Sequence, residues 1–201
     1  MRGTLLLGAL LLTLTWSQAD YEFRYIEGET FSRGETEGVR AEGFTSWMGH
    51  PSGGKVEVFG RPAGGFLEYD VTGLQAGDYT ILVRCLAAPT TRTRVLWDGR
   101  DLGLIKHEQA STALRWSLPL GPVAGPGTHV LRLQGSDDTT QWPYIDTILL
   151  TNAAGYVPPA EDRDFASYTT AWPPLTLKAD AATALAPEPI GSAPLPAGLT
   201  I

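Results

Sequence analysis

Short runs in which apolar and polar residues alternate fill the sequence between residues 65 and 151. Glycine, aspartate and proline separate these runs at intervals of about 8–12 residues. Because successive side chains of a strand point to opposite faces, each run can bury one face and expose the other. No stretch keeps a 3.6-residue apolar period, so helices should be scarce. The pattern predicts an all-β fold, an antiparallel β-sandwich or jelly roll.

One run, residues 79–86, is apolar on both faces and predicts a central strand. Asp98-Gly99 lies between two runs and is a strong hairpin signal. Residues 33–54 are rich in glycine and glutamate, and we expect a long surface loop there, where binding residues tend to lie. The predicted strands cover residues 21–31, 55–59, 66–71, 79–86, 93–97, 102–105, 114–120, 128–134 and 144–151.

The first 19 residues have the features of an export signal. Arg2 supplies a positive charge, Leu5 to Leu14 form an apolar core too short to span a bilayer, and Ser17 and Ala19 are small residues before a cleavage point. No later run is long and apolar enough to cross a membrane. We therefore expect a secreted or periplasmic protein, with no membrane insertion after the signal peptide is removed.

Composition narrows the partners of the exported chain. The formal net charge of the full sequence is −7, it becomes slightly more negative when Arg2 is removed with the signal, and lysine is scarce, which argues against nucleic acid and anionic membranes as partners. Cys85 is the only cysteine, so no internal disulfide can form. It alternates in phase with Tyr79, Ile81 and Val83, which predicts a small buried hydrophobe rather than a reactive thiol.

The character of the chain changes near its end. From Gly155 onward, proline and alanine dominate and the strand alternation stops. Such a composition favours an extended, semi-rigid spacer. The expected organisation is a signal peptide at 1–19, a β-sandwich domain at 20–157, and a linker or the start of a further module at 158–201. A spacer in this place predicts that a further domain follows in a longer protein.

Motifs spread along the domain add a family resemblance. They are I-E-G-E at residues 26–29, G-D-Y-T at 77–80 with Val83-Arg84, W-D-G at 97–99, Trp116, and Y-I-D-T-I at 144–148. In this order and spacing, residues 21–152 resemble the carbohydrate-binding modules of families 6 and 35, in the galactose-binding-like jelly-roll group. The resemblance implies a domain that binds a polysaccharide or oligosaccharide.

The resemblance also implies a structural calcium ion, held by Glu27, Glu29 and Asp146 between the first and last strands. The residues themselves make this chemically reasonable. Glu27 and Glu29 are two apart on an expected strand and would repel each other on one face, whereas Ca²⁺ takes six to eight oxygen ligands. In the alternative, Glu27 and Glu29 lie on a solvated face and Asp146 pairs with an arginine such as Arg24.

The sugar site that the resemblance implies lies in loops at one end of the sandwich, where aromatic side chains hold a sugar ring. Two positions depart from the family pattern: the loop tryptophan falls on Ala113, and the asparagine before the last strand falls on Tyr144. The remaining candidates for ligand binding are Trp47, His50, Gln141, Trp142 and Tyr144. As alternatives, Trp47 could cap the core and Trp142 could pack on the sheet edge.

No nucleophile elbow, phosphate loop or metalloprotease helix is present. The sequence therefore predicts a non-catalytic, exported carbohydrate-binding module that targets an attached glycoside hydrolase or polysaccharide lyase to its polymer. The alternative is a structural or protein-interaction β-sandwich of an exported multidomain protein, without sugar binding. The departures at Ala113 and Tyr144 favour this alternative.

Overall fold

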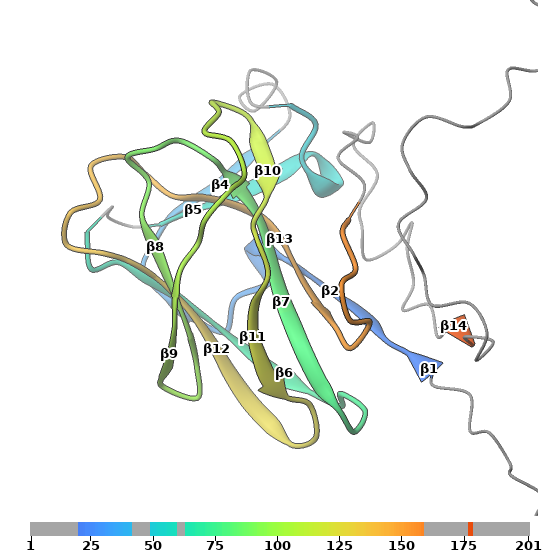
Figure 1. The fold of residues 1–201 in the computed structure, drawn as a ribbon. Coiled ribbons are helices and arrows are strands. Elements are labelled where there is room, and N and C mark those ends of the chain that lie inside the picture. Colours follow the sequence, from blue (N-terminus) through green and yellow to red (C-terminus); the bar gives the residue numbers. More distant parts are fainter. Residues whose placement is uncertain (1–19, 42–48, 60–62, 159–176, 179–201) are drawn as a thin grey trace, which may run out of the picture. The chain divides into compact units, whose positions relative to one another are not determined.

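The structure is a computed structural model that describes residues 20–41, 49–59, 63–158 and 177–178 (Figure 1). Within these ranges there is no α-helix, and the two short helices η1 (Gly28–Thr30) and η3 (Ser52–Gly54) are 3-10 turns. The predicted signal peptide, Trp47 and most of the predicted linker lie outside the described ranges. None of the helices described is long and apolar enough to cross a membrane.

One sheet has seven strands, and β7 and β13 lie at its centre. β13 pairs with β7 along its length, with β5 at its beginning and with β2 toward its end. β7 pairs with β11 at its beginning and with β10 at its end. All pairs are antiparallel. The strands are β2 (Phe23–Glu27), β4 (Thr36–Ala41), β5 (Lys55–Phe59), β7 (Asp78–Leu86), β10 (Leu114–Trp116), β11 (Leu120–Ala124) and β13 (Tyr144–Thr151).

The second sheet has five antiparallel strands in the order β3-β6-β12-β8-β9. Asp98 and Gly99 both have positive φ values, 50° and 78°, in the tight turn between β8 and β9, which confirms the predicted hairpin. The strands are β3 (Arg33–Gly34), β6 (Phe66–Thr72), β8 (Thr93–Trp97), β9 (Arg100–Leu104) and β12 (Thr128–Gly135). Two further short strands are β1 (Asp20–Tyr21) and β14 (Leu177–Lys178).

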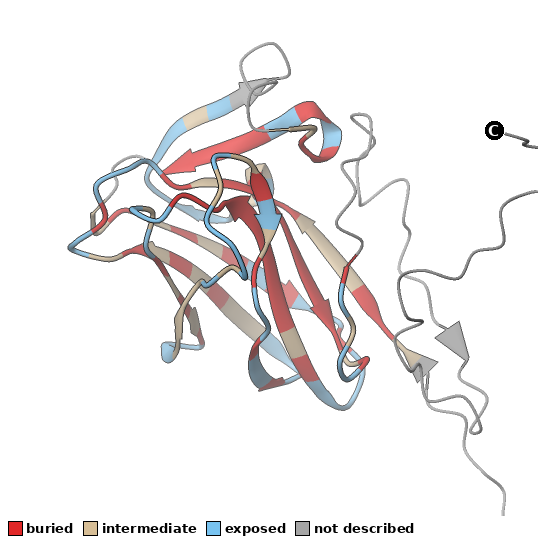
Figure 2. Cartoon of the chain, turned by 45° about the horizontal axis from the view of Figure 1, so that its top comes forward, coloured by how far each residue is buried: buried red, intermediate tan, exposed pale blue. Residues whose placement is uncertain are grey.

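The core lies between the two sheets. Every second side chain of β7, including Ile81 and Val83, belongs to one buried cluster that also contains Leu131 and Leu133 of β12. Strands of both sheets are therefore buried along their facing sides (Figure 2). Cys85 belongs to this core, and burial raises its thiol pKa to about 12, which confirms the predicted buried hydrophobe. The antiparallel β-sandwich expected from the alternating runs is confirmed.

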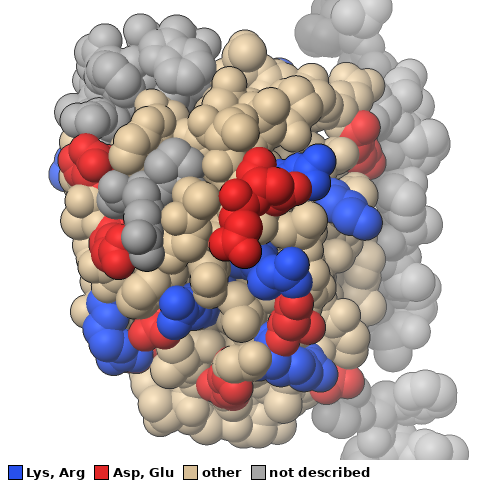
Figure 3. Space-filling view, turned by 90° about the vertical axis from the view of Figure 1, so that its left-hand side faces the viewer, with Lys and Arg blue, Asp and Glu red and all other residues tan. Residues whose placement is uncertain are grey.

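The outer side of the five-stranded sheet mixes both signs of charge. Arg33 pairs with Glu68 at 2.8 Å and with Asp70 at 2.9 Å, and Arg132 pairs with Glu68 at 3.2 Å. The guanidinium of Arg132 also lies 3.8 Å from the ring centroid of Phe66. The face shown in Figure 3 likewise interleaves basic and acidic side chains. Such pairing creates no single-sign field on that face for a polyanion to follow.

The structure corrects two predictions of secondary structure. Residues 33–54 contain β3, β4 and η3 instead of one loop. β4 pairs only with β5, so it is an edge strand, and its residues 36–37 and Val39 are exposed, which explains why no apolar alternation marks it. The predicted strand at 114–120 ends early as β10, and β11 begins at Leu120. Ser117 N still donates to Val83 O of β7, but Leu118 N donates to Lys106 O, which interrupts the pairing with β7.

Candidate functional site

Loops from three parts of the chain meet at one end of the sandwich and enclose a pocket of about 450 Å³, called here the rim pocket. The first loop follows β7, the second precedes β10, and the third precedes β13. Three of the residues that the sequence predicts to bind a ligand, Gln141, Trp142 and Tyr144, line this pocket. The other lining residues are Leu86, Ala88, Pro89, Thr90, Thr112 and Thr140.

Backbone hydrogen bonds hold these loops together. Ser111 N donates to Ala87 O at 3.0 Å, and Ala87 N donates to Ala113 O at 3.3 Å, which joins the first loop to the second. Thr140 N donates to Thr90 O at 3.3 Å and joins the first loop to the third. The pocket walls are thus tied to one another, so a ligand would meet a largely preformed site.

The rim pocket combines aromatic surface with uncharged polar groups. Trp142 is 37% exposed although it is a large hydrophobic residue, and Tyr144 is half-buried beside it. The hydroxyl of Thr90 and the amide of Gln141 are on exposed residues of the same pocket. No described residue that lines the pocket is charged. Rings for apolar C–H surfaces and neutral donors and acceptors for hydroxyls suit an uncharged, hydroxyl-rich ligand.

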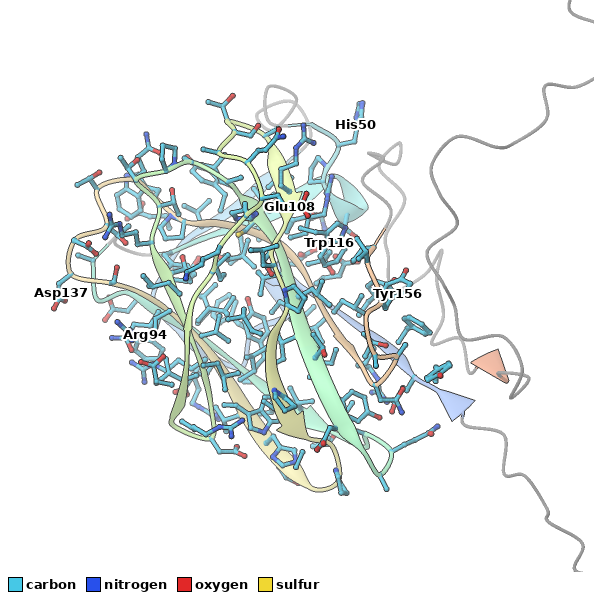
Figure 4. All side chains as sticks on the ribbon, in the orientation of Figure 1. His50, Arg94, Glu108, Trp116, Asp137 and Tyr156 are labelled. Carbon is cyan, nitrogen blue, oxygen red and sulfur yellow. The ribbon has the colours of Figure 1, made fainter. Side chains whose placement is uncertain are left out.

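Of the other two predicted ligand-binding residues, one lies elsewhere and one is outside the described residues. His50 does not line the rim pocket, and its backbone oxygen instead accepts a hydrogen bond from Arg84 at 3.1 Å. Figure 4 shows His50 at the top of the view, on the segment before η3. Trp47 lies outside the described residues. The sequence did not predict Thr90, Thr112 and Thr140 as part of the pocket. A single threonine in a loop looks the same in sequence whether it binds a ligand or only forms a turn.

A network of charged and polar groups, called here the clamp, is buried away from solvent. Its central residue, Asp146, follows Tyr144 of the rim pocket by two positions. Asp146 is fully buried on β13, and its Oδ2 lies 2.5 Å from Nη1 of Arg84, which is 3% exposed on β7. Ser52 N donates to Asp146 Oδ1 at 2.6 Å, and Ser52 Oγ donates to Glu27 Oε1 at 2.7 Å. The clamp therefore joins β2, η3, β7 and β13.

Burial dominates the electrostatics of the clamp. It raises the pKa of Asp146 to about 7, and the nearby Arg84 charge opposes that rise only in part. Glu29 lies in η1, not on β2 as predicted. Burial, and then the charges of Glu27 and Glu57, raise the pKa of Glu29. Its Oε2 is buried without a hydrogen-bond partner among the described residues.

The residues expected to hold calcium are thus near one another, but their arrangement does not fit a three-carboxylate site. Both oxygens of Asp146 are already engaged, one by Arg84 and one by Ser52. Among the described residues, no group of three or more His, Cys, Asp or Glu side chains is placed to hold a metal ion. Asp146 has an arginine partner, as in the alternative reading, but Arg24 instead pairs with Glu22 at 3.0 Å. The calcium ion itself stays a prediction from the resemblance.

Comparisons with known proteins give matches among solved structures only. No protein-family model matches the sequence, and a search of curated proteins finds no match. The GH26-CBM35 β-(1,4)-mannanase of Podospora anserina is 18% identical, with a TM-score of 0.49; the match covers 68% of this chain and 29% of that chain. An exo-β-1,3-galactanase from Phanerochaete chrysosporium is 16% identical, with a TM-score of 0.47, over 64% of this chain and 29% of that one.

A third match is a module on its own. It is the CBM36-1 domain of a multidomain xylanase from the hindgut metagenome of Trinervitermes trinervoides, 15% identical with a TM-score of 0.44. The match covers 68% of this chain and 99% of that domain, whereas this chain spans less than a third of the two enzymes above. The matched structures thus include carbohydrate-binding modules and glycoside hydrolase chains. At these TM-scores the likeness carries no argument about the ligand, which rests on the geometry of the rim pocket.

Proposed function

We propose that residues 20–157 form a non-catalytic carbohydrate-binding module whose rim pocket binds a neutral saccharide. One observation carries the proposal: Trp142, 37% exposed, lies with Tyr144 in a preformed pocket that has no charged residue in its described lining. An apolar ring face beside neutral hydroxyls and an amide matches the two surfaces of a sugar, its C–H face and its hydroxyl rim.

The wider role follows from the sequence together with this site. The export signal predicted at residues 1–19 and the Pro/Ala-rich segment at 158–201 support a secreted or periplasmic module on a longer protein. The role proposed for such a module is to keep an attached glycoside hydrolase or polysaccharide lyase near its polymer. Plant-type polysaccharides are the first ligands to test for such a role.

A second candidate function is a structural or protein-interaction sandwich without sugar binding. The residue that favours it is Ala113, which stands where the family resemblance places a loop tryptophan. Tyr144 likewise replaces an asparagine that would offer a donor and an acceptor together. The rim pocket therefore has fewer ring and amide groups than the resemblance implies, and only a binding experiment separates the two functions.

The test is affinity electrophoresis of the full chain in gels that contain mannan, xylan, β-glucan or galactan. We expect retention by at least one polymer, and loss of that retention in Trp142→Ala. Val39→Ala is the matched control, because Val39 is an exposed hydrophobic residue (44%) that does not line the rim pocket. Trp47→Ala tests the remaining predicted residue. Equal mobility of the wild type in all gels would support the structural role instead.

A further inference from the structure

A second pocket, of about 590 Å³, lies on the face of the seven-stranded sheet that points away from the core. Leu82 and Arg84 of β7 line it, and they alternate with Ile81 and Val83, whose side chains belong to the core. The loop before β10, β10 itself and the segment after β13 complete this outer-face pocket. It shares no lining residue with the rim pocket.

Two aromatic side chains line the outer-face pocket, and both pack against buried hydrophobic residues of the sheet. Trp116 and Tyr156 are half-buried and pack against a small cluster that includes Phe23 and Leu82. The rings of Tyr156 and Phe23 meet edge to face, with centroids 4.7 Å apart and an interplanar angle of 70°. Anchored rings lose little side-chain freedom when a ligand binds on them. Trp116 therefore packs on the outer side of the seven-stranded sheet and is not part of the core between the two sheets.

Exposed apolar surface gathers at the same place. Only four large hydrophobic residues are exposed in the described part of the chain, and two of them, Leu118 (39%) and Val157 (78%), line the outer-face pocket. A third, Trp142, lines the rim pocket. Exposed hydrophobic residues thus mark the two pockets, whereas single exposed residues scattered over a surface would need no explanation.

The polar groups of the outer-face pocket are planar and balanced in charge. Glu108, Gln109 and Arg115 are exposed and line it, offering a carboxylate, an amide and a guanidinium. Glu108, Trp116 and Tyr156, which are labelled in Figure 4, all line this pocket. Charged planar groups can form paired hydrogen bonds to neighbouring hydroxyls, and these bonds are stronger than those of neutral groups.

The remaining titratable groups that line the pocket add no net charge to it. His107 Nδ1 lies 3.1 Å from Trp116 O and so donates to it, while Nε2 lies 3.6 Å from Cys85 Sγ and accepts from the thiol. Burial lowers the pKa of His107, in agreement with a neutral ring. The charge of Arg84 is paired with Asp146. One carboxylate and one guanidinium are left, so neither an anionic nor a cationic ligand is favoured.

We propose that the outer-face pocket is a second saccharide site, with Trp116 and Tyr156 as its ring platform and Glu108, Gln109 and Arg115 as its hydroxyl-binding groups. The proposal rests on the proposed function for its class of ligand. Because the two pockets share no lining residue, one polysaccharide chain or two neighbouring chains can occupy both. Binding to a polymer is then tighter than binding to a short oligosaccharide, through effective concentration.

The test uses ¹H–¹⁵N spectra of the full chain, in which the tryptophan indole N–H signals report each pocket separately. The probes are the β-1,4-linked hexaoses of mannose, xylose and glucose. We expect one of them to shift the Trp116 and Trp142 signals. In Trp142→Ala the Trp116 shift remains. In the double variant Glu108→Ala/Arg115→Ala, the Trp116 shift is lost, or the affinity measured from it falls by about tenfold or more, while the Trp142 shift remains.

Both altered residues of the double variant are exposed, so folding is preserved, and Val39→Ala again serves as the control. Each result decides between the two proposals. A shift of Trp142 alone overturns the second site and leaves the proposed function. A shift of Trp116 alone supports the second site and overturns the role of the rim pocket. If no saccharide moves either signal, both proposals fail. If, in addition, a decaproline peptide shifts the Trp116 signal, the outer-face pocket is assigned to peptide binding.

Discussion

Tyr144 and Asp146 are two residues apart on β13 and belong to regions with opposite properties. Tyr144 is half-buried in the rim pocket, with uncharged neighbours and space for a ligand. Asp146 is fully buried in the clamp, and both of its oxygens are engaged by Arg84 and Ser52. The polar groups of the clamp are hydrogen-bonded to one another and so stabilise the fold. The rings and hydroxyls of the rim pocket are exposed and so remain available to a ligand. We therefore expect changes in the clamp to alter stability, and changes in the rim pocket to alter binding.

The largest effect is expected from Arg84→Met. This variant leaves the buried Asp146 without its cation, and breaking such a pair costs about 3–5 kcal/mol of unfolding free energy. Urea denaturation measures the loss. The double variant Arg84→Met/Asp146→Leu should recover most of it, because replacing both charges by apolar groups is often neutral. A single variant as stable as the wild type would show that the clamp does not hold the strands together.

Trp142→Ala, unlike Arg84→Met, should reduce ligand binding and leave stability almost unchanged. We expect saccharide affinity to fall by about tenfold or more, because Trp142 is the one large hydrophobic residue classed as exposed among the described residues that line the pocket. The unfolding free energy should change by no more than about 0.5 kcal/mol, since the side chain is already partly exposed. Calorimetric titration and urea denaturation of the same sample check both parts. A large loss of stability would mean that Trp142 packs on the sheet edge as a structural residue.

The pH dependence of stability sharpens the same contrast. Burial raises the pKa of Asp146 from 3.8 to about 7 in the folded protein. Between these values the folded state binds more protons than the unfolded state, so this group favours folding most below pH 4, and that contribution is lost as the pH rises through 7. Asp146→Asn should remove this fall in stability. Denaturation at pH 4 to 8 measures it, and identical profiles for variant and wild type would contradict the raised pKa.

The smallest effect is expected from removal of divalent cations. Because Arg84 and Ser52 already engage Asp146, EDTA should shift the melting temperature by less than about 1 °C. Addition of Mg²⁺ after EDTA controls for ionic strength. A fall of more than about 5 °C, reversed by Ca²⁺ but not by Mg²⁺, would establish the calcium ion that the family resemblance implies. It would also show that the clamp takes a different arrangement around the metal.

Much of the fold could be predicted because burial of one face leaves a period-2 signal. β6, β7, β12 and β13 carry that signal, and their positions are confirmed to within a residue or two. β4 carries none, because an edge strand with exposed side chains needs no apolar alternation. The break between β10 and β11 coincides with the hydrogen bond from Leu118 N to Lys106 O, which leaves the pairing with β7 and which no apolar pattern marks.

Three residues of the candidate site, Gln141, Trp142 and Tyr144, could be predicted from the sequence. Trp142 and Tyr144 stand beside the last strand, where the resemblance placed a sugar site, and both line the rim pocket. Thr90 and Thr112 join them only through loop pairing across the fold. The sequence also showed that a buried Asp146 needs a partner. That partner is Arg84, 62 positions away, and it could not be chosen before the pairing of β7 with β13 was known.

The most direct test of the rim pocket is an NMR titration of the labelled full chain with the oligosaccharide that its polymer assay selects. The account predicts saturable shifts of the Gln141 side-chain amide, the Trp142 indole and the Tyr144 backbone amide, with the backbone amide of Val39, which lines neither pocket, unchanged. Saturable shifts elsewhere, with those three signals unmoved, would contradict it.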